Sequence, residues 1–201
     1  MQTTRRRLPK ITFNSPVTLS FVIACVAVQA VSTLTGGAFT AAFFSAGAFW
    51  PGDPLSYLCL VTYIFGHAGW EHLFANMGYI LILGPLLEEK YGSGRLMCIM
   101  LASALAGSLA NLVLLHAGVV GASGVVFTFM LLSSFAGLHD GEVPLTFILV
   151  AVFYLTQQLY GALFVGGNIS YLGHIAGGVV GAAVGFLLPA RDKGTSGYGM
   201  L

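Results

Sequence analysis

Hydrophobic residues fill long stretches of this chain, and polar residues separate these stretches instead of alternating with apolar ones. A helix that crosses a bilayer needs about 20 predominantly apolar residues. The pattern therefore predicts an all-α membrane protein, a bundle of six transmembrane helices whose short connections leave no room for a separate soluble domain. The expected helices span about residues 17–34, 72–87, 96–116, 123–138, 143–165 and 171–188.

The composition supports a membrane environment. Hydrophobic residues make up 57% of the chain and charged residues only 7%, whereas a soluble domain carries about 25% charged residues. This number of charges is too small to cover a water-facing surface. We therefore expect the chain to lie in a lipid bilayer. The net charge of +1 gives no indication of a nucleic-acid partner. We expect one helical domain over residues 16–190, with tails at 1–15 and 191–201.

The first apolar stretch follows a basic segment, as in a secretory signal peptide. It is long for a signal sequence, however, and no A-x-A-like cleavage site clearly ends it. We interpret it as a retained transmembrane helix.

The positions of the basic residues give the orientation. With six crossings, all eight Lys and Arg residues fall on one side, while the other side carries only Asp53 and Glu71. Basic residues favour the cytoplasmic side, so both termini are expected in the cytoplasm of a bacterial-type plasma membrane. The basic residues are Arg5, Arg6, Arg7, Lys10, Lys90, Arg95, Arg191 and Lys193.

The connection over residues 36–69 is unusually apolar for a loop. It is rich in Phe and is interrupted by the segment from Pro51 to Pro54. A broken apolar segment of this length predicts a re-entrant or interfacial hairpin in the outer leaflet. The alternative is an ordinary external loop with aromatic residues at the membrane interface.

Polar side chains inside a bilayer are costly and usually mark a functional site. Ser123 opens the fourth predicted helix within Gly121-Ala122-Ser123-Gly124. The free amides of a helix N-terminus favour a developing negative charge, and the two glycines permit a tight turn there. Ser123 is therefore a candidate nucleophile. The alternative is that its hydroxyl simply caps the helix.

His174 lies in the sixth predicted helix, followed by Gly177 and Gly181. Glycines at this spacing let another helix approach closely, which would bring the Ser123 hydroxyl within reach of the imidazole. A histidine can take a serine proton and later return it to a leaving amine. The alternative is a structural histidine that is hydrogen-bonded between helices.

His72 and Asn76 share one face of the second predicted helix, and His67 precedes them. Their side chains can donate hydrogen bonds to an oxyanion without adding a fixed charge. A zinc protease motif would need H-E-x-x-H and a third ligand. The chain has Trp70-Glu71-His72-Leu73-Phe74 instead, so we expect no metal site.

Together these motifs resemble the rhomboid family of intramembrane serine proteases. That family carries G-x-S-G at the start of the fourth helix, a histidine followed by glycines in the sixth, and H-x-x-x-N in the second. This chain has all three in that order, at Ser123, His174 and His72 with Asn76. The resemblance covers the chain apart from its tails. It implies a serine endopeptidase that cleaves transmembrane protein substrates and needs no cofactor.

The resemblance also implies roles for single residues. Ser123 would be the nucleophile and His174 the general base and acid, a dyad because no predicted helix contains a carboxylate. His72, Asn76 and the Ser123 amide would form the oxyanion hole. The family often has Tyr packed against the histidine four residues after the serine, where this chain has Phe127. The supporting residues would be His67, Gly121, Gly124, Phe127, Gly177 and Gly181.

One departure from the family lies in the first external loop. Many members carry a Trp-Arg pair there, but this chain has Leu58 and Cys59 in the corresponding stretch. That puts the loop-stabilising contacts of the family in doubt, although it leaves the chemistry untouched. There are two alternative functions. A non-enzymatic binder of transmembrane segments would be expected to lose the catalytic residues, whereas this sequence keeps Ser123 and His174. A small transporter or channel would be expected to show charged residues within its helices or repeated halves, and the sequence shows neither.

Overall fold

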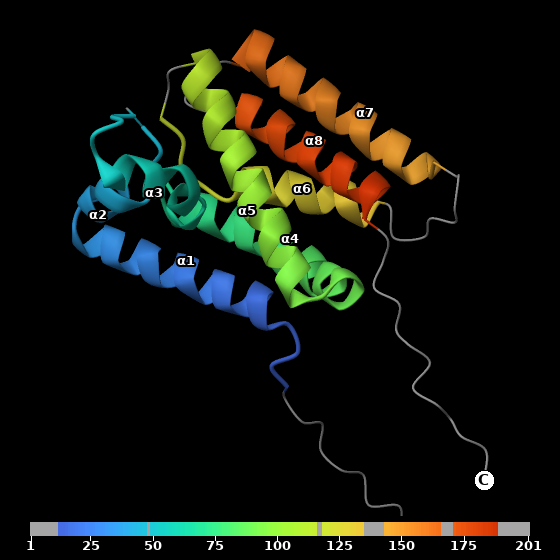
Figure 1. The fold of residues 1–201 in the computed structure, drawn as a ribbon, viewed down its shortest axis with the longest axis horizontal. Helices are drawn as coiled ribbons and strands as arrows, with labels where there is room; N and C mark the ends of the chain where they lie inside the picture. The colour runs from blue at the N-terminus through green and yellow to red at the C-terminus, as the bar shows by residue number, and fades with distance from the viewer. Residues whose placement is uncertain (1–11, 48, 116–117, 135–142, 166–170, 189–201) are drawn as a thin grey trace, which may run out of the picture.

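The structure, a computed structural model, describes residues 12–47, 49–115, 118–134, 143–165 and 171–188. These residues form a bundle of helices (Figure 1), which confirms the predicted all-α fold class. The π-helical turns Asn111–Leu115 and Gly161–Val165 extend α5 and α7. The helices are α1 (Pro16–Leu34), α2 (Ala38–Phe43), α3 (Pro54–Thr62), the 3-10 helix η1 (Tyr63–Phe65), α4 (Trp70–Tyr91), α5 (Ser93–Ala110), α6 (Ser123–Ser133), α7 (Leu145–Tyr160) and α8 (Tyr171–Leu187).

A helix lies at each of the six predicted positions, namely α1, α4, α5, α6, α7 and α8. Two described helices, Pro16–Leu34 and Ser93–Leu114, are long and apolar enough to cross a bilayer. The apolar helices α6 and α7 are shorter, and so is the apolar stretch Gly173–Leu187 of α8. The six crossings therefore stay a prediction. The predicted helix ends at residues 116 and 138 fall outside the described residues. The predicted start at residue 143 lies two residues before α7 begins. Of the predicted tails, the structure describes only residues 12–15.

Helix α6 occupies the centre of the bundle, with α4, α5 and α8 packed against it. Its sequence is apolar around the whole helix, which is typical of a helix buried on every side. Val125, Val126, Phe129 and Leu132 are all buried in the core. Figure 1 shows α7 on the outside of α8, at the edge of the bundle.

Small residues bring α8 into backbone contact with α6. A Cβ atom added to Gly177 would overlap the Gly124 carbonyl, and one added to Gly181 would lie 2.9 Å from Thr128 Cα. The Thr128 hydroxyl lies 2.7 Å from the Gly177 carbonyl oxygen and 2.8 Å from Ser103 Oγ of α5. This close approach fixes the position of His174 relative to the first turn of α6.

A buried carboxylate joins α1 to α4. Glu88, near the end of α4, accepts hydrogen bonds from the backbone amides of Val17 and Thr18, both at 2.9 Å. It also accepts hydrogen bonds from the hydroxyls of Thr18 and Ser93, both at 2.8 Å. The first amides of a helix have no partner within the helix and favour a negative charge. Glu88 therefore secures the start of α1.

The first external connection contains two short helices, α2 and α3, separated by the Pro-Gly-Asp-Pro break. Asp53 caps α3 by accepting a 3.0 Å hydrogen bond from the Leu55 amide. The Thr62 hydroxyl donates to the Phe43 carbonyl at 2.7 Å and so ties α3 to α2. The depth of this connection in a membrane stays a prediction.

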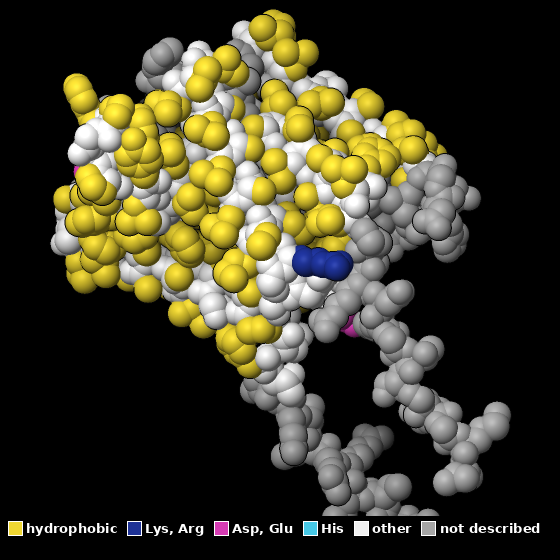
Figure 2. All heavy atoms as spheres, in the orientation of Figure 1, with side chains coloured by type: hydrophobic (Ala, Val, Ile, Leu, Met, Phe, Trp, Pro, Cys, Tyr) yellow, Lys and Arg dark blue, Asp and Glu magenta, His cyan; other side chains and the backbone are white. Residues whose placement is uncertain are grey.

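The surface of the bundle is strongly apolar. Among the described residues, Figure 2 shows hydrophobic side chains spread over the visible face and basic atoms near the end of the bundle where α1 begins. On α7 the large side chains of Leu145, Leu149 and Phe153 are exposed. An apolar surface of this extent fits contact with lipid.

Candidate active site

The turn before α6 is held in place from two directions. Val119 and Ala46 exchange backbone hydrogen bonds of 2.8 and 3.0 Å, and the Gly121 amide donates to the Tyr63 carbonyl at 3.1 Å. Gly121 has a φ of +116°, a backbone conformation that favours glycine. This turn directs the chain so that α6 begins at Ser123.

The Ser123 hydroxyl contacts the imidazole of His174. Ser123 Oγ of α6 and His174 Nε2 of α8 lie 2.7 Å apart. No side chain caps α6, whose N-cap residue is Ala122. The capping alternative for Ser123 is therefore not what the structure shows. His174 does connect helices, as the structural alternative expects, but one of its partners is the serine.

The other nitrogen of His174 has a partner that the sequence analysis missed. Gln158 of α7 places Oε1 2.8 Å from His174 Nδ1, and its side chain is only 4% exposed. An amide oxygen can only accept, so Nδ1 carries the proton and Nε2 accepts from the Ser123 hydroxyl. The available signal was a pair of adjacent glutamines, Gln157 and Gln158, in a largely apolar predicted helix.

Aromatic rings pack against the imidazole. The Phe127 ring lies 4.7 Å from the His174 ring and 4.1 Å from the Tyr154 ring, measured between centroids. Phe127 offers no hydroxyl, so its contact with His174 is ring packing alone. Tyr154 comes from α7, on the same side as Gln158.

His72 and Asn76 of α4 face the turn that precedes Ser123. A Cβ atom added to Gly121 would lie 2.9 Å from His72 Nε2 and 3.7 Å from Asn76 Nδ2. The Ala68 amide approaches His72 Nδ1 at 3.5 Å, which leaves Nε2 to carry the proton. Asn76 Nδ2 is buried and has no hydrogen-bond partner among the described residues. Two neutral donors are thus directed toward one place beside Ser123.

His67 contacts His72 from the segment that precedes α4. Its Nδ1 is 3.3 Å from the Phe65 carbonyl oxygen, and its ring packs edge-on to His72 at 5.1 Å. Burial, followed by the nearby His72, lowers the pKa of His67 to about 4, so the ring is neutral at physiological pH. Among the described residues, no group of three or more His, Cys, Asp or Glu could hold a metal ion.

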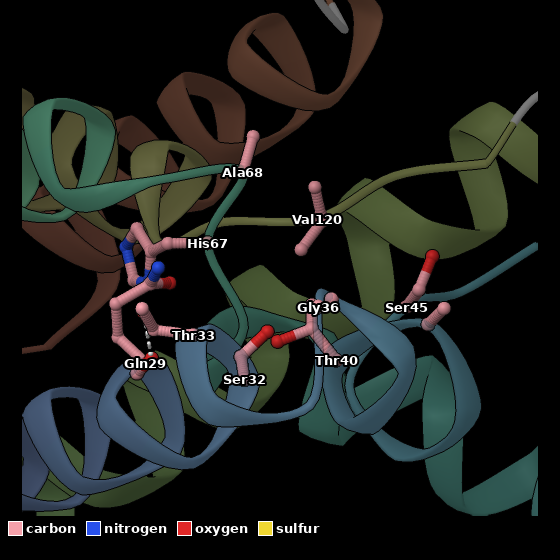
Figure 3. Close-up of a pocket in the computed structure, with 11 residues that line it drawn as sticks. Gln29, Ser32, Thr33, Gly36, Thr40, Ser45, His67, Ala68 and Val120 are labelled. Atoms are coloured by element: carbon pink, nitrogen blue, oxygen red, sulfur yellow. Dashed lines mark hydrogen bonds between the residues drawn. The ribbon is translucent and has the colours of Figure 1, made fainter.

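A cavity of about 470 Å³, lined in part by polar side chains, lies beside this histidine, between α1, α2 and the segment at residues 67–68. Figure 3 shows Gln29 on α1, Thr40 on α2 and His67 around it. Gln29 Oε1, Thr40 Oγ1 and His67 Nε2 are buried without a partner in the described part of the chain. Neither Ser123 nor His174 lines this cavity. It adjoins the candidate site but is separate from it.

Comparison with known proteins gives consistent matches. The family model for the Rhomboid domain matches residues 54–191. The Rhomboid protease GlpG of Yersinia pseudotuberculosis is 25% identical over 178 residues, which cover 85% of this chain and 62% of the relative. The GlpG of Salmonella choleraesuis is 28% identical over 187 residues, 89% of this chain and 66% of the relative.

Another bacterial relative matches a shorter region. The Rhomboid protease GluP of Bacillus subtilis is 33% identical over 122 residues, 61% of this chain and 24% of the relative. The chain thus spans 62 to 66% of the length of the GlpG relatives described above. The family match begins at the first residue of α3, so α1 and α2 precede it.

Proposed function

Because the chain belongs to the rhomboid family, we propose that it is an intramembrane serine protease that cleaves peptide bonds in or near the transmembrane segments of membrane proteins. The observation that carries the proposal is the 2.7 Å contact between Ser123 Oγ and His174 Nε2. Both residues lie within the matched region, and the relatives described above are named rhomboid proteases.

The first half of the reaction is attack on the peptide carbonyl. Ser123 Oγ bonds to the carbonyl carbon while His174 Nε2 takes the hydroxyl proton. The negative charge that develops on the carbonyl oxygen accepts hydrogen bonds from His72 Nε2, Asn76 Nδ2 and the Ser123 amide. Donors that wait in place for this charge stabilise the transition state more than the substrate.

The second half releases both products. His174 returns its proton to the leaving amine, and the acyl group remains on Ser123 Oγ. Water then attacks the ester carbonyl, His174 takes a proton from this water, and Ser123 recovers its hydroxyl as the acid product leaves. Ser123 and His174 act as a dyad, without a carboxylate.

The substrate is a transmembrane helix that unwinds locally, because the peptide bonds of an intact helix are shielded by their own hydrogen bonds. The family resemblance points to small residues at the cleavage site and to entry beside α7. Both termini are cytoplasmic, in a bacterial-type plasma membrane, and water reaches Ser123 from the external face. The α2–α3 connection lies in the outer leaflet.

The test uses the purified full chain in detergent with a fluorogenic transmembrane substrate. We expect cleavage by the wild type and its loss in Ser123→Ala and in His174→Ala. A fluorophosphonate probe should label the wild type and not Ser123→Ala. Equal cleavage by all three proteins would overturn the proposal.

A further inference from the structure

We propose that Gln158 is a positioning residue that holds His174 in the tautomer and orientation needed to accept the serine proton. This inference rests on the proposed protease function and adds a third, uncharged member to the dyad. It is carried by the 2.8 Å contact between Gln158 Oε1 and His174 Nδ1.

The location of Gln158 supports a specific role. Only Tyr154 and Gln158 are buried among the side chains that the structure describes on α7. A buried amide costs free energy unless it is hydrogen-bonded. The adjacent Gln157 is exposed, so the two neighbouring glutamines differ in whether they face His174.

The chemistry of imidazole explains what Gln158 contributes. Neutral imidazole carries one proton, and the nitrogen without it is the base. An acceptor at Nδ1 keeps the proton there, which leaves Nε2 free to accept from Ser123. When Nε2 becomes protonated, the Nδ1–H bond to Gln158 persists, so the ring does not have to reorient. Papain-like proteases likewise use an amide, an asparagine, as the third member of a Cys-His-Asn array.

The hydrogen bond also closes a set of contacts around one ring. His174 is held at Nε2 by Ser123 of α6, at Nδ1 by Gln158 of α7, and on its ring by Phe127 at 4.7 Å. If the Nδ1 acceptor is removed, rotation of the ring and the opposite tautomer are no longer opposed. In that tautomer Nε2 carries a proton and cannot take one from Ser123.

The experiment measures kcat and KM with the fluorogenic transmembrane substrate, and the rate of fluorophosphonate labelling at Ser123. Gln158→Leu and Gln158→Met remove the acceptor and replace the amide by an apolar side chain of similar size. We expect both to lower kcat and the labelling rate about tenfold to hundredfold. A loss of this size lies between the effect of losing one neutral hydrogen bond and the effect of losing the general base altogether. KM should stay within about twofold, because Gln158 acts on the base and does not touch substrate.

Two further variants separate positioning from packing. Gln158→Glu keeps an acceptor oxygen at the same reach and should restore most of the lost labelling rate. Gln157→Leu makes the same change at the exposed neighbour and should behave as the wild type. Wild-type kcat and labelling in Gln158→Leu would overturn the inference, and so would equal losses in Gln158→Leu and Gln158→Glu. Neither result touches the dyad, whose failure would show instead as activity of Ser123→Ala.

Discussion

Among single residues, Asn76 carries the clearest conflict between stability and function. Its Nδ2 is buried beside Gly121 without a hydrogen-bond partner among the described residues. A buried donor left unpaired costs about 1–3 kcal/mol. Such a cost is expected at a site that prepares donors for a charge that appears only during the reaction.

We therefore predict that Asn76→Leu raises the thermal unfolding temperature and lowers kcat about hundredfold, the usual effect of losing one oxyanion donor. The control is Asn111→Leu, because Asn111 is also buried but its Nδ2 donates to the Gly107 carbonyl at 2.8 Å. That change should lower the unfolding temperature. Thermal unfolding in detergent and substrate cleavage measure both effects, and a less stable but fully active Asn76→Leu protein would contradict the prediction.

The sequence singled out Ser123, His72 and His174 as candidate site residues, but not Gln158. G-x-S-G and H-x-x-x-N are local patterns whose chemistry can be read from the residues themselves. Gln158 belongs to no motif, and its role depends on which face of α7 meets α8. The apolar sequence of α7 does not reveal that face, because lipid and protein neighbours both favour hydrophobic side chains.

At the scale of elements, the contact between α6 and α8 depends on the absence of a side chain at Gly177. The Gly124 backbone lies where a Cβ would be. Backbone atoms move aside only if the whole helix moves, and α8 carries His174. The same contact thus serves both packing and the distance between Ser123 and His174.

Gly177→Ala is predicted to destabilise the protein by about 1–3 kcal/mol, the usual cost of overpacking a core, and to slow fluorophosphonate labelling of Ser123. Gly78→Ala in α4 is the matched control, since nothing lies within 4 Å of its added Cβ. It should be neutral or stabilise by up to about 1 kcal/mol, because alanine favours a helix over glycine. Equal unfolding free energies for the two variants would contradict the role assigned to Gly177.

Hydrophobic stretches predicted where the long helices lie, but not how α5 and α7 end. Each is followed by a π-helical turn, a rare form of helix. The six residues of α2 were also beyond prediction, because a helix so short is stable only through its tertiary contacts.

At the scale of the whole molecule, Glu88 connects the beginning of α1, the end of α4 and the beginning of α5. Burial by itself raises the pKa of this carboxyl group. The hydrogen bonds from Thr18, Val17 and Ser93 outweigh burial, so the pKa of Glu88 lies below its ordinary value. A lowered pKa means that the folded state prefers the ionised carboxylate.

The resulting prediction concerns pH. The stabilisation by Glu88 is complete above its ordinary pKa of about 4.3 and is lost as the pH falls through the lower folded-state value. The unfolding temperature should therefore fall as the pH is lowered below that ordinary value, and Glu88→Gln should flatten that dependence. Glu71→Gln is the control at an exposed position of the same helix. Parallel pH curves for wild type and Glu88→Gln would rule out this contribution.

Helix α7 has the smallest contact with its neighbours among the long described helices, yet it supplies the acceptor for His174. Suppose that a substrate displaces α7 on its way in, as the family resemblance indicates. Gln158 then moves away from His174, and His174 lacks its Nδ1 acceptor for as long as α7 is displaced. Substrate entry and catalysis would then exclude each other, because His174 regains its acceptor only when α7 returns to its place beside α8.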